Sequence, residues 1–501
     1  MLAFLQLDAC GDELLERLLA EGRMPVLEEL RRRGRWLALD NSNDLMFEAG
    51  VYPSLYTGVE TADHGLYYPI MWDQEAMRLR YMDRFRRPDA VWDRLADAGA
   101  RSLVIDPYQL WAPERTLGAS FSSWQYRHKI IPGWSQPPAE RRRARRLHGE
   151  PPTLVDVAGA RGLPEMLAMR EVLIGAPARL QSLALDLLSR ESFDFAWLTF
   201  TAMHQAGHHF WGLPQLPSQP APADRHLLET ALEEVYERSD AAMGRILETL
   251  PPGSEVIVLS PIGMGPNTMR SDLLPEMVAR ILDPEHPQEA AAGSAIWRLR
   301  AGLPSWARRF ANRALPEAAV RELLGRMYTR GVDWGRTRAT VLPGDHFGYV
   351  RLNVRGRERD GIVEPGEIEP LMDEIEAGLL TFADDDGAPS VAGVRRPQTE
   401  LAGERSELLP DLVVEWSDHP TGDLTGVASP RFGRIPRRSV GSGRSGNHHR
   451  GAWVLLPGAD GSRPEAGRQP NVIDLAATAC ARLGVEADLK GVDLPREHGV
   501  G

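Results

Sequence analysis

Cysteine is scarce in this 501-residue chain, which holds only Cys10 and Cys480. Two cysteines cannot build a disulfide framework or a cysteine-rich zinc or iron–sulfur module, so any metal site must use histidine and carboxylate ligands. Lysine is equally scarce, with Lys129 and Lys490, and nearly all positive charge is therefore arginine. The 58 basic and 70 acidic residues give a net charge of −12, which points to neither a charged tail nor a nucleic-acid surface.

Long apolar runs are also missing. No stretch approaches the ~20 apolar residues of a membrane-spanning helix, and the first residues lack the basic segment and cleavage site of a secretory signal. Because 43% of the residues are hydrophobic and 26% are charged, the chain can bury a large core. We therefore expect a globular protein of the cytoplasm, with no membrane and no nucleic-acid duplex among its partners. The sequence leaves the oligomeric state open.

Apolar segments of strand length alternate with segments of helical periodicity. The predicted strands cover residues 3–7, 102–105, 193–199, 255–259, 348–352, 411–416 and 452–456, and the predicted helices cover residues 12–19, 25–33, 90–98, 178–189, 227–250, 368–380 and 472–483. This alternation predicts an α/β fold: a three-layer αβα sandwich with a mostly parallel central sheet and helical cap insertions.

Two stretches interrupt the alternation, residues 108–175 and residues 266–337. We interpret both as insertions over one edge of the sheet. The predicted organisation is a first part of the core at residues 1–265, which includes a cap segment at about 108–175, a helical cap insertion at 266–337, and a second part of the core at 338–501. The arginine run Arg141 to Arg146 favours a solvated helical face over an anion site.

Polar side chains stand at the ends of several predicted strands, where α/β sheets bind their ligands. Asp8 follows the first strand, and His204 and His208 follow the strand at 193–199. Their spacing places two imidazoles on one helical face, which suits zinc. Two further observations favour a metal site over histidines that merely cap or pack. One is the second histidine cluster at His448, and the other is the position of Asp8 at a strand end. Asp8 could instead cap the helix that begins at Asp12.

Taken in order, the motifs of this chain resemble the alkaline phosphatase superfamily, and within it the type I phosphodiesterase and nucleotide pyrophosphatase-like proteins. The motifs are Leu7-Asp8, Gly22-Arg-Met-Pro25, Tyr52-Pro-Ser-Leu-Tyr-Thr-Gly58 with His64-Gly65, His204-Gln-Ala-Gly-His208, Ser260-Pro-Ile-Gly-Met-Gly265, Arg351-Leu-Asn-Val-Arg-Gly-Arg-Glu358, Pro410-Asp-Leu-Val-Val414 and Gly446-Asn-His448. For typical members the resemblance implies two divalent metals, usually zinc, that flank a threonine or serine nucleophile.

Carried over by position, the resemblance assigns His204, His208 and His448 to the first metal site. Three neutral ligands with one open position are typical of a catalytic zinc. The second metal site departs from the family, because Pro261 and Ile262 stand where members carry metal-binding side chains. Only the carboxylates of Asp8 and Glu48 would remain as ligands there. We therefore predict one zinc and find little support for a second divalent metal.

Glu48 falls at the position of the nucleophile when the Tyr-Thr-Gly turn is aligned, whereas Thr57 belongs to the turn. A carboxylate can attack phosphorus, hold a metal or act as a general base toward water. We therefore expect a metal-dependent hydrolase of small-molecule phosphate esters, of the phosphodiester or nucleotide pyrophosphate type. Two alternatives stay open: a non-hydrolytic binding or scaffold protein, and group transfer in a biosynthetic pathway.

Overall fold

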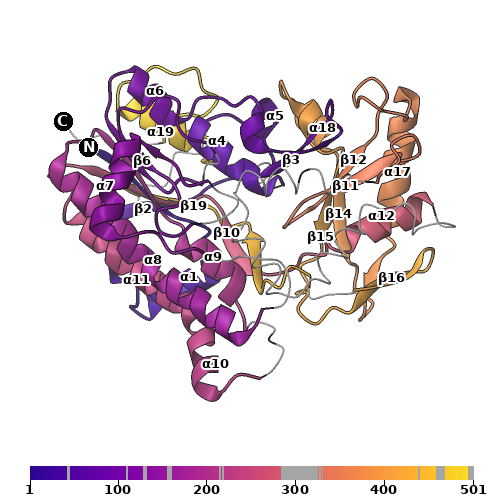
Figure 1. Cartoon of the computed structure of the whole chain (residues 1–501), viewed down its shortest axis with the longest axis horizontal. Helices are drawn as coiled ribbons and strands as arrows, with labels where there is room; N and C mark the ends of the chain where they lie inside the picture. The colour runs from indigo at the N-terminus through magenta and orange to yellow at the C-terminus, as the bar shows by residue number, and fades with distance from the viewer. Residues whose placement is uncertain are drawn as a thin grey trace.

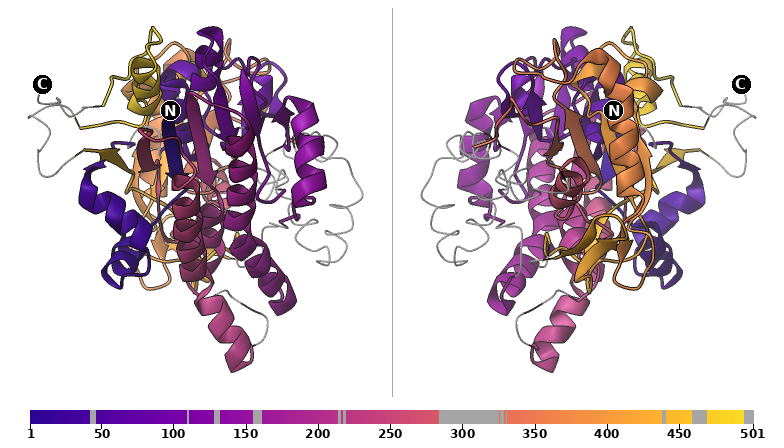
Figure 2. Two further views of the ribbon diagram at one scale, coloured as in Figure 1. Left: turned by 90° about the vertical axis from the view of Figure 1, so that its left-hand side faces the viewer. Right: turned by 90° about the vertical axis from the view of Figure 1, so that its right-hand side faces the viewer.

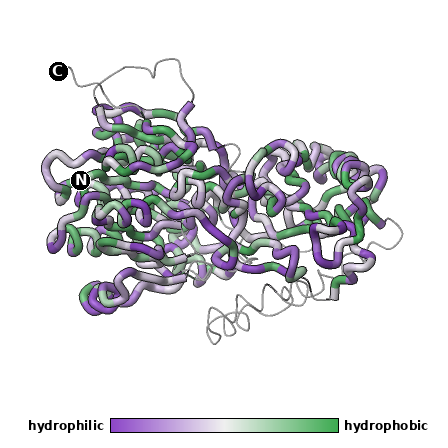
Figure 3. The backbone as a smooth tube through the Cα atoms, turned by 90° about the horizontal axis from the view of Figure 1, so that it is seen from above, coloured by the Kyte–Doolittle hydropathy of each residue, from purple (hydrophilic) through white to green (hydrophobic). Residues whose placement is uncertain are grey.

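The chain folds into two lobes that lie side by side (Figure 1 and Figure 3). The computed structural model describes residues 1–41, 46–108, 111–127, 132–154, 161–213, 216, 219–283, 325, 329, 331–437, 441–458 and 469–494. The larger lobe contains the N-terminal strand and a large mixed sheet, and the smaller lobe contains an antiparallel sheet built mostly from residues 339–437.

The sheet of the larger lobe has eight strands among the described residues. In spatial order they are β2 (Gly34–Ala38), β19 (Trp453–Pro457), β9 (Glu255–Ser260), β1 (Leu2–Leu7), β8 (Phe195–Phe200), β5 (Ser102–Ile105), β6 (Gly118–Phe121) and β7 (Ser135–Gln136). Strands β9, β1, β8, β5 and β6 run parallel, and the remaining pairings are antiparallel. The carboxyl ends of the parallel strands therefore meet at one edge, as the sequence predicted.

Helices cover both faces of this sheet, because successive side chains of a strand point to opposite faces. Leu5 and Leu198 join one apolar core, and Phe4 and Trp197 join the other. The first face is covered by α1 (Asp12–Ala20), α2 (Pro25–Arg33), α8 (Leu163–Arg190), α9 (Ala202–Phe210) and α11 (Ala231–Leu247), and the second by α4 (Val51–Thr57), α6 (Val91–Asp97) and α19 (Asp474–Arg482). The predicted three-layer α/β fold is confirmed.

The smaller lobe is built on the antiparallel sheet β11 (Ala339–Leu342), β12 (Gly348–Leu352), β15 (Leu412–Trp416) and β14 (Val391–Arg395), in the spatial order β11-β12-β15-β14. Helices α12 (Leu274–Leu282) and α17 (Ile368–Leu379) pack on one face of it. Its other face meets residues of the larger lobe around Met71 and Trp72, in the hairpin of β3 (Ile70–Asp73) and β4 (Arg78–Tyr81). A further small sheet joins β13 (Ala383–Asp384), β16 (Gly426–Ser429) and β17 (Gly433–Pro436).

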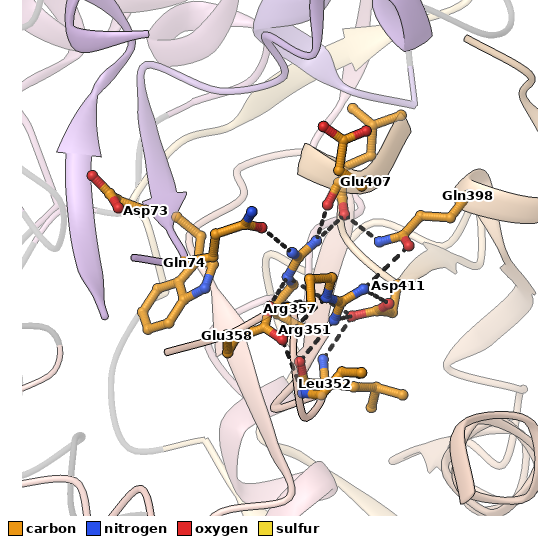
Figure 4. Close-up of polar contacts among 12 residues, drawn as sticks. Asp73, Gln74, Arg351, Leu352, Arg357, Glu358, Gln398, Glu407 and Asp411 are labelled. Atoms are coloured by element: carbon orange, nitrogen blue, oxygen red, sulfur yellow. Dashed lines mark hydrogen bonds and ion pairs between the residues drawn. The ribbon is translucent and has the colours of Figure 1, made fainter. Parts of the chain in front are cut away.

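A buried ionic network ties the β3–β4 hairpin to the smaller lobe (Figure 4). The Arg351 guanidinium donates from Nε to Glu358 Oε1 (2.8 Å) and from Nη2 to Gln74 Oε1 (3.0 Å). Arg357 forms a bidentate pair with Asp411, at 2.6 and 2.8 Å. Apart from Gln74, these side chains belong to two of the motifs that carry the family resemblance, and their contacts here hold the fold together.

The structure corrects several details of the prediction. The strands at 348–352 and 411–416 lie in the second, antiparallel sheet rather than in the main one. The helix expected at 178–189 begins at Leu163, and the helix expected at 227–250 is split into α10 (Pro222–Glu229) and α11. Figure 2 shows α10 projecting from the end of the helical layer.

The proposed cap segments are described only in part, and the domain boundaries stay a prediction. In the segment about 108–175, β6 and β7 extend the main sheet at one edge, α7 (Pro138–His148) carries the arginine run, and the rest leads into α8. Most of the helical cap predicted at 266–337 lies outside the described residues, and its first helix, α12, packs in the smaller lobe.

By length and composition α8 could cross a membrane, since it has 28 residues and a mean hydropathy of 1.2 over its most apolar window. Only 39% of that window is buried. Its buried side chains, among them Leu173, Leu180 and Leu187, join the core against the main sheet, and the helix packs on α11. A core helix can have the same length and composition, so the expected absence of a membrane partner stays a prediction.

Candidate metal centre

Three histidines converge at the carboxyl edge of the main sheet. His204 and His208 come from α9, which begins directly after β8, and His448 comes from β18 (Gly446–His449). One ring nitrogen from each lies within 4.8 Å of the others. The three residues are buried, with 3%, 1% and 5% of their surfaces exposed. The structure thus brings together the three residues assigned to the first metal site.

Two close backbone approaches bring His448 to α9. Strand β18 pairs with β10 (Gly263–Pro266), so that His448 stands opposite Met264. Gly446 lies so near α9 that a Cβ atom built on it would be 2.2 Å from the Gly207 carbonyl oxygen. The carbonyl oxygen of Gly446 is 3.1 Å from His208 Nδ1. Gly207 and Gly446 therefore let α9 and β18 approach closely enough for their histidines to meet.

The environment keeps two of these imidazoles neutral. Burial, reinforced by the positive charge of Arg444, holds the pKa of His208 well below its usual range. Burial and the neighbouring His204 do the same to the pKa of His448. A neutral imidazole carries the lone pair that a metal needs. The site thus offers ligands in the required protonation state without removing protons at neutral pH.

The donor set fits zinc. Because the Nδ1 proton of His208 is donated to the Gly446 carbonyl, its Nε2 lone pair remains available. The buried Nδ1 of His448 has no hydrogen-bond partner among the described residues. An unpartnered buried nitrogen costs free energy unless something binds it. Among the described residues no other group of three such side chains converges in this way.

Asp8 lies directly beside His204 at the end of β1. Its carboxylate is fully buried, and Oδ2 lies 3.0 Å from His204 Nδ1. Oδ1 accepts hydrogen bonds from the Tyr52 hydroxyl and from Gln6 Nε2, each at 3.0 Å. Asp8 is not among the converging ligand atoms, nor does it cap α1, whose N-cap residue is Gly11.

The segment expected to carry the second metal site offers no ligand side chain. Ile262 is fully buried in the apolar core beside α4 and α19, and the Pro261 carbonyl accepts a hydrogen bond from Asn41 Nδ2 at 2.9 Å. Ser260 at the end of β9 donates to the Ile262 carbonyl (2.9 Å) and accepts from the Cys10 backbone (3.0 Å). This turn is therefore held by structural hydrogen bonds.

The residues around the expected nucleophile are only partly described. The backbone of Glu48 begins the 3-10 helix η1 (Glu48–Gly50), directly before α4, and its side chain lies outside the described residues. Thr57 is buried and donates to the Pro53 carbonyl within α4 (2.7 Å). Both ring nitrogens of His64 are hydrogen-bonded, to Ser54 and to the Leu66 backbone, and burial lowers its pKa to about 3. The side chains of Thr57 and His64 thus make local hydrogen bonds within or next to α4 and α5 (Thr61–His64).

Sequence reasoning missed several neighbours of the three histidines. The Tyr108 ring, shortly after β5, stacks on His204 with centroids 5.2 Å apart. Arg444, two residues before Gly446, pairs with Asp345 at 3.1 Å. Asp8, Tyr108, His204 and Gln205 help to line a hollow of about 370 Å³, which includes space open to solvent. Asp106 also lines this hollow, and the positions of Asp106 and Tyr108 just past the end of β5 were the available signal.

The family of the chain follows from comparison with known sequences. Residues 2–420 match the type I phosphodiesterase / nucleotide pyrophosphatase family. The chain belongs to this family, which confirms the resemblance drawn from the ordered motifs. No curated protein sequence matches it.

Solved structures with a similar arrangement are distant in sequence. Phosphonoacetate hydrolase from Sinorhizobium meliloti 1021, in complex with phosphonoformate, is 16% identical, with 96% of this chain and 95% of that chain covered and a TM-score of 0.48. Human ectonucleotide pyrophosphatase / phosphodiesterase 5 is 11% identical, with coverages of 98% and 96% and a TM-score of 0.45. An inactive murine form of the latter, in complex with AMP, is also 11% identical, with coverages of 99% and 96% and a TM-score of 0.45. The activity of this chain has to be argued from its own site.

Proposed function

We propose that the chain is a zinc-dependent hydrolase of small phosphate esters, of the phosphodiester or nucleotide pyrophosphate type. The observation that carries the proposal is the convergence of His204, His208 and His448 at the carboxyl edge of the sheet, in a chain of the phosphodiesterase family. A zinc ion held there would polarise the phosphate and lower the pKa of a bound water molecule. The buried imidazoles would hold the ion, and the Arg444 guanidinium, which also pairs with Asp345, would add positive charge near it for an anionic substrate.

Glu48 is our proposed proton acceptor or nucleophile. Support comes from its place in the chain, one helical turn before Tyr52, whose hydroxyl contacts His204 (3.1 Å). A carboxylate there can take a proton from attacking water or attack phosphorus itself. The cytoplasmic location is part of the same proposal, and cell fractionation tests it.

The experiment measures zinc content and turnover in the same preparation. We expect about one zinc per chain and hydrolysis of nitrophenyl phosphate mono- or diesters that chelators abolish. His208→Ala should remove both properties. His209→Ala is the matched control, because its Nδ1 faces Arg161 (3.1 Å) and it does not belong to the converging group. Turnover indifferent to chelation and to His204→Ala would contradict the zinc mechanism.

A second candidate is a non-hydrolytic binding protein with the same fold. Pro261 and Ile262 favour it, because neither side chain can bind a metal and they stand where family members hold the second metal. A fully zinc-loaded protein without turnover of any phosphate ester would support this function, or group transfer, instead of hydrolysis.

A further inference from the structure

The buried Asp8 carboxylate is surrounded by hydrogen-bond donors. Gln6 Nε2 and the Tyr52 hydroxyl donate to Oδ1, and His204 Nδ1 faces Oδ2, all at 3.0 Å. Asp8 is fully buried, and among the described residues His204 is its one ion-pair partner. An ionised carboxylate has about four acceptor sites. Three of them are therefore already occupied by groups of the protein.

This arrangement determines which nitrogen of His204 carries the proton. Asp8 only accepts hydrogen bonds when ionised, so the proton of the neutral ring lies on Nδ1. The Tyr52 hydroxyl gives its own proton to Asp8, and its oxygen then faces Nδ1 as a second acceptor at 3.1 Å. The lone pair of His204 is thereby placed on Nε2.

A second set of hydrogen bonds fixes the orientation of Gln6. Its Oε1 accepts from Trp197 Nε1 (2.9 Å) and from the Tyr56 hydroxyl (3.1 Å). An indole nitrogen can only donate, so the amide oxygen must face it and the amide nitrogen must face Asp8. The chain of contacts from Trp197 through Gln6 to Asp8 crosses β8 and β1, which pair in parallel register. The carboxylate is thus held by the sheet itself.

The His204 ring is also clamped by aromatic side chains. Tyr108 stacks on it with an interplanar angle of 10°, and Tyr52 stacks on Tyr108 with centroids 4.4 Å apart. Tilting the ring would break the stacking, and flipping it would break the hydrogen bond to Asp8. A metal-bound histidine typically donates its other ring N–H to a carboxylate, which orients the ring and strengthens the ligand.

We propose that Asp8 and Tyr52 are positioning residues that orient His204 for zinc, and that Asp8 does not bind a metal directly. The inference rests on the proposed zinc site. The family resemblance assigns Asp8 to a second metal. In this chain the Asp8 carboxylate instead orients His204, a ligand of the first metal. Its buried negative charge, which no lysine or arginine within ion-pair distance offsets among the described residues, adds to the affinity for a dication.

The test measures zinc affinity of metal-free protein by competition with a chromophoric chelator, together with zinc content at saturation. Asp8→Asn should weaken zinc binding by about 10- to 100-fold, the range found for outer partners of metal ligands, while saturation still yields one ion per chain. Tyr52→Phe keeps the ring and should cause a smaller loss. The control is Tyr349→Phe, which removes another buried hydroxyl, one that donates to the Met46 carbonyl (3.0 Å).

Thermal unfolding of each metal-free variant checks the fold, and the cobalt-substituted protein adds a readout of coordination. At saturation, Asp8→Asn should keep the wild-type cobalt spectrum, because the ligands are unchanged. A wild type with two ions, of which Asp8→Asn loses one, would show that Asp8 is a direct ligand and overturn the proposal. Unchanged zinc affinity in both variants would also overturn it, with the zinc site intact. A wild type that binds no zinc would instead refute the proposed function.

Discussion

At the scale of single residues, the histidines differ by what their ring nitrogens contact. Both nitrogens of His64 are engaged in local hydrogen bonds, and His209 faces Arg161. His208 contacts the carbonyl of Gly446, which is 238 positions away in the chain. The helical spacing could predict that His204 and His208 share a face. Whether a histidine is a candidate ligand or a structural residue depends on the groups that contact its ring nitrogens. For His208 that group lies in a distant segment, so the local sequence does not reveal it.

Glu48→Gln tests the residue at the expected nucleophile position. The substitution keeps the size of the side chain and removes its charge, so kcat should fall by about 10² to 10⁴ if the carboxylate is a general base, and further if it is the nucleophile. Steady-state turnover of a nitrophenyl phosphodiester measures this effect. Zinc content, measured alongside, should not change.

Thr57→Val is the matched comparison. It removes a hydroxyl that donates to the Pro53 carbonyl, so it should cost about 1 kcal/mol of stability and leave kcat near the wild-type value. If Thr57→Val proves the more damaging change for turnover while fold and zinc content survive, the alignment that places Glu48 at the nucleophile position is wrong.

At the scale of elements, apolar or periodic segments were predictable, and elements that exist only through contacts with distant segments were not. The sequence located β1, β5, β9, α1 and α2 within a residue or two of their observed ends. It placed the start of α8 too late, at 178, whereas the observed helix begins at Leu163 and continues through Pro177, a residue that disfavours helix interiors. Strands β10 and β18 consist of four residues each and exist because they pair with each other. The ribbon that presents His448 could not be predicted from its own sequence.

Gly446→Ala tests the contact between this ribbon and α9. The added Cβ would lie 2.2 Å from the Gly207 carbonyl oxygen and 2.7 Å from Trp211 Cβ, so backbone must shift. Because the shift moves His448 relative to His208, zinc affinity should fall by about tenfold or more. Chelator competition measures it. Gly366→Ala, where no atom lies within 4 Å of the new Cβ, should leave zinc affinity unchanged.

Glu358→Gln tests the buried ionic network. Arg351 and Glu358 each have only 1% of the side chain exposed, and both Glu358 oxygens are hydrogen-bonded. Removing the negative charge takes away the nearer carboxylate of a buried guanidinium and leaves Asp411 at 4.0 Å, which should lower the free energy of unfolding by about 3 kcal/mol. Denaturant unfolding followed by tryptophan fluorescence measures the loss. The control is Asp360→Asn, which alters the exposed pair with Arg359 and should leave the free energy of unfolding nearly unchanged. Equal losses of stability in Glu358→Gln and Asp360→Asn would argue against the network.

At the scale of the whole molecule, the two lobes were not separable in the sequence. The apolar segments that form β12 and β15 resemble those of the main sheet, and strand periodicity does not say which sheet a strand joins. The chain leaves the main sheet after β9, builds the smaller lobe, and returns through β18 to β19. The histidine cluster lies at this return, where His448 on the incoming ribbon meets α9 of the larger lobe.

A metal held by His204, His208 and His448 would therefore join segments that are about 240 positions apart, at the point where the chain returns from the smaller lobe. Zinc that binds only the native state should stabilise it by about 2.7 kcal/mol when free zinc exceeds the dissociation constant 100-fold. Calorimetry of metal-free protein titrated with zinc should show an unfolding temperature that rises with zinc concentration. His209→Ala should keep this response and His208→Ala should lose it. An equal response in all three proteins would mean that zinc binds elsewhere, and the converging histidines would then not be the metal site.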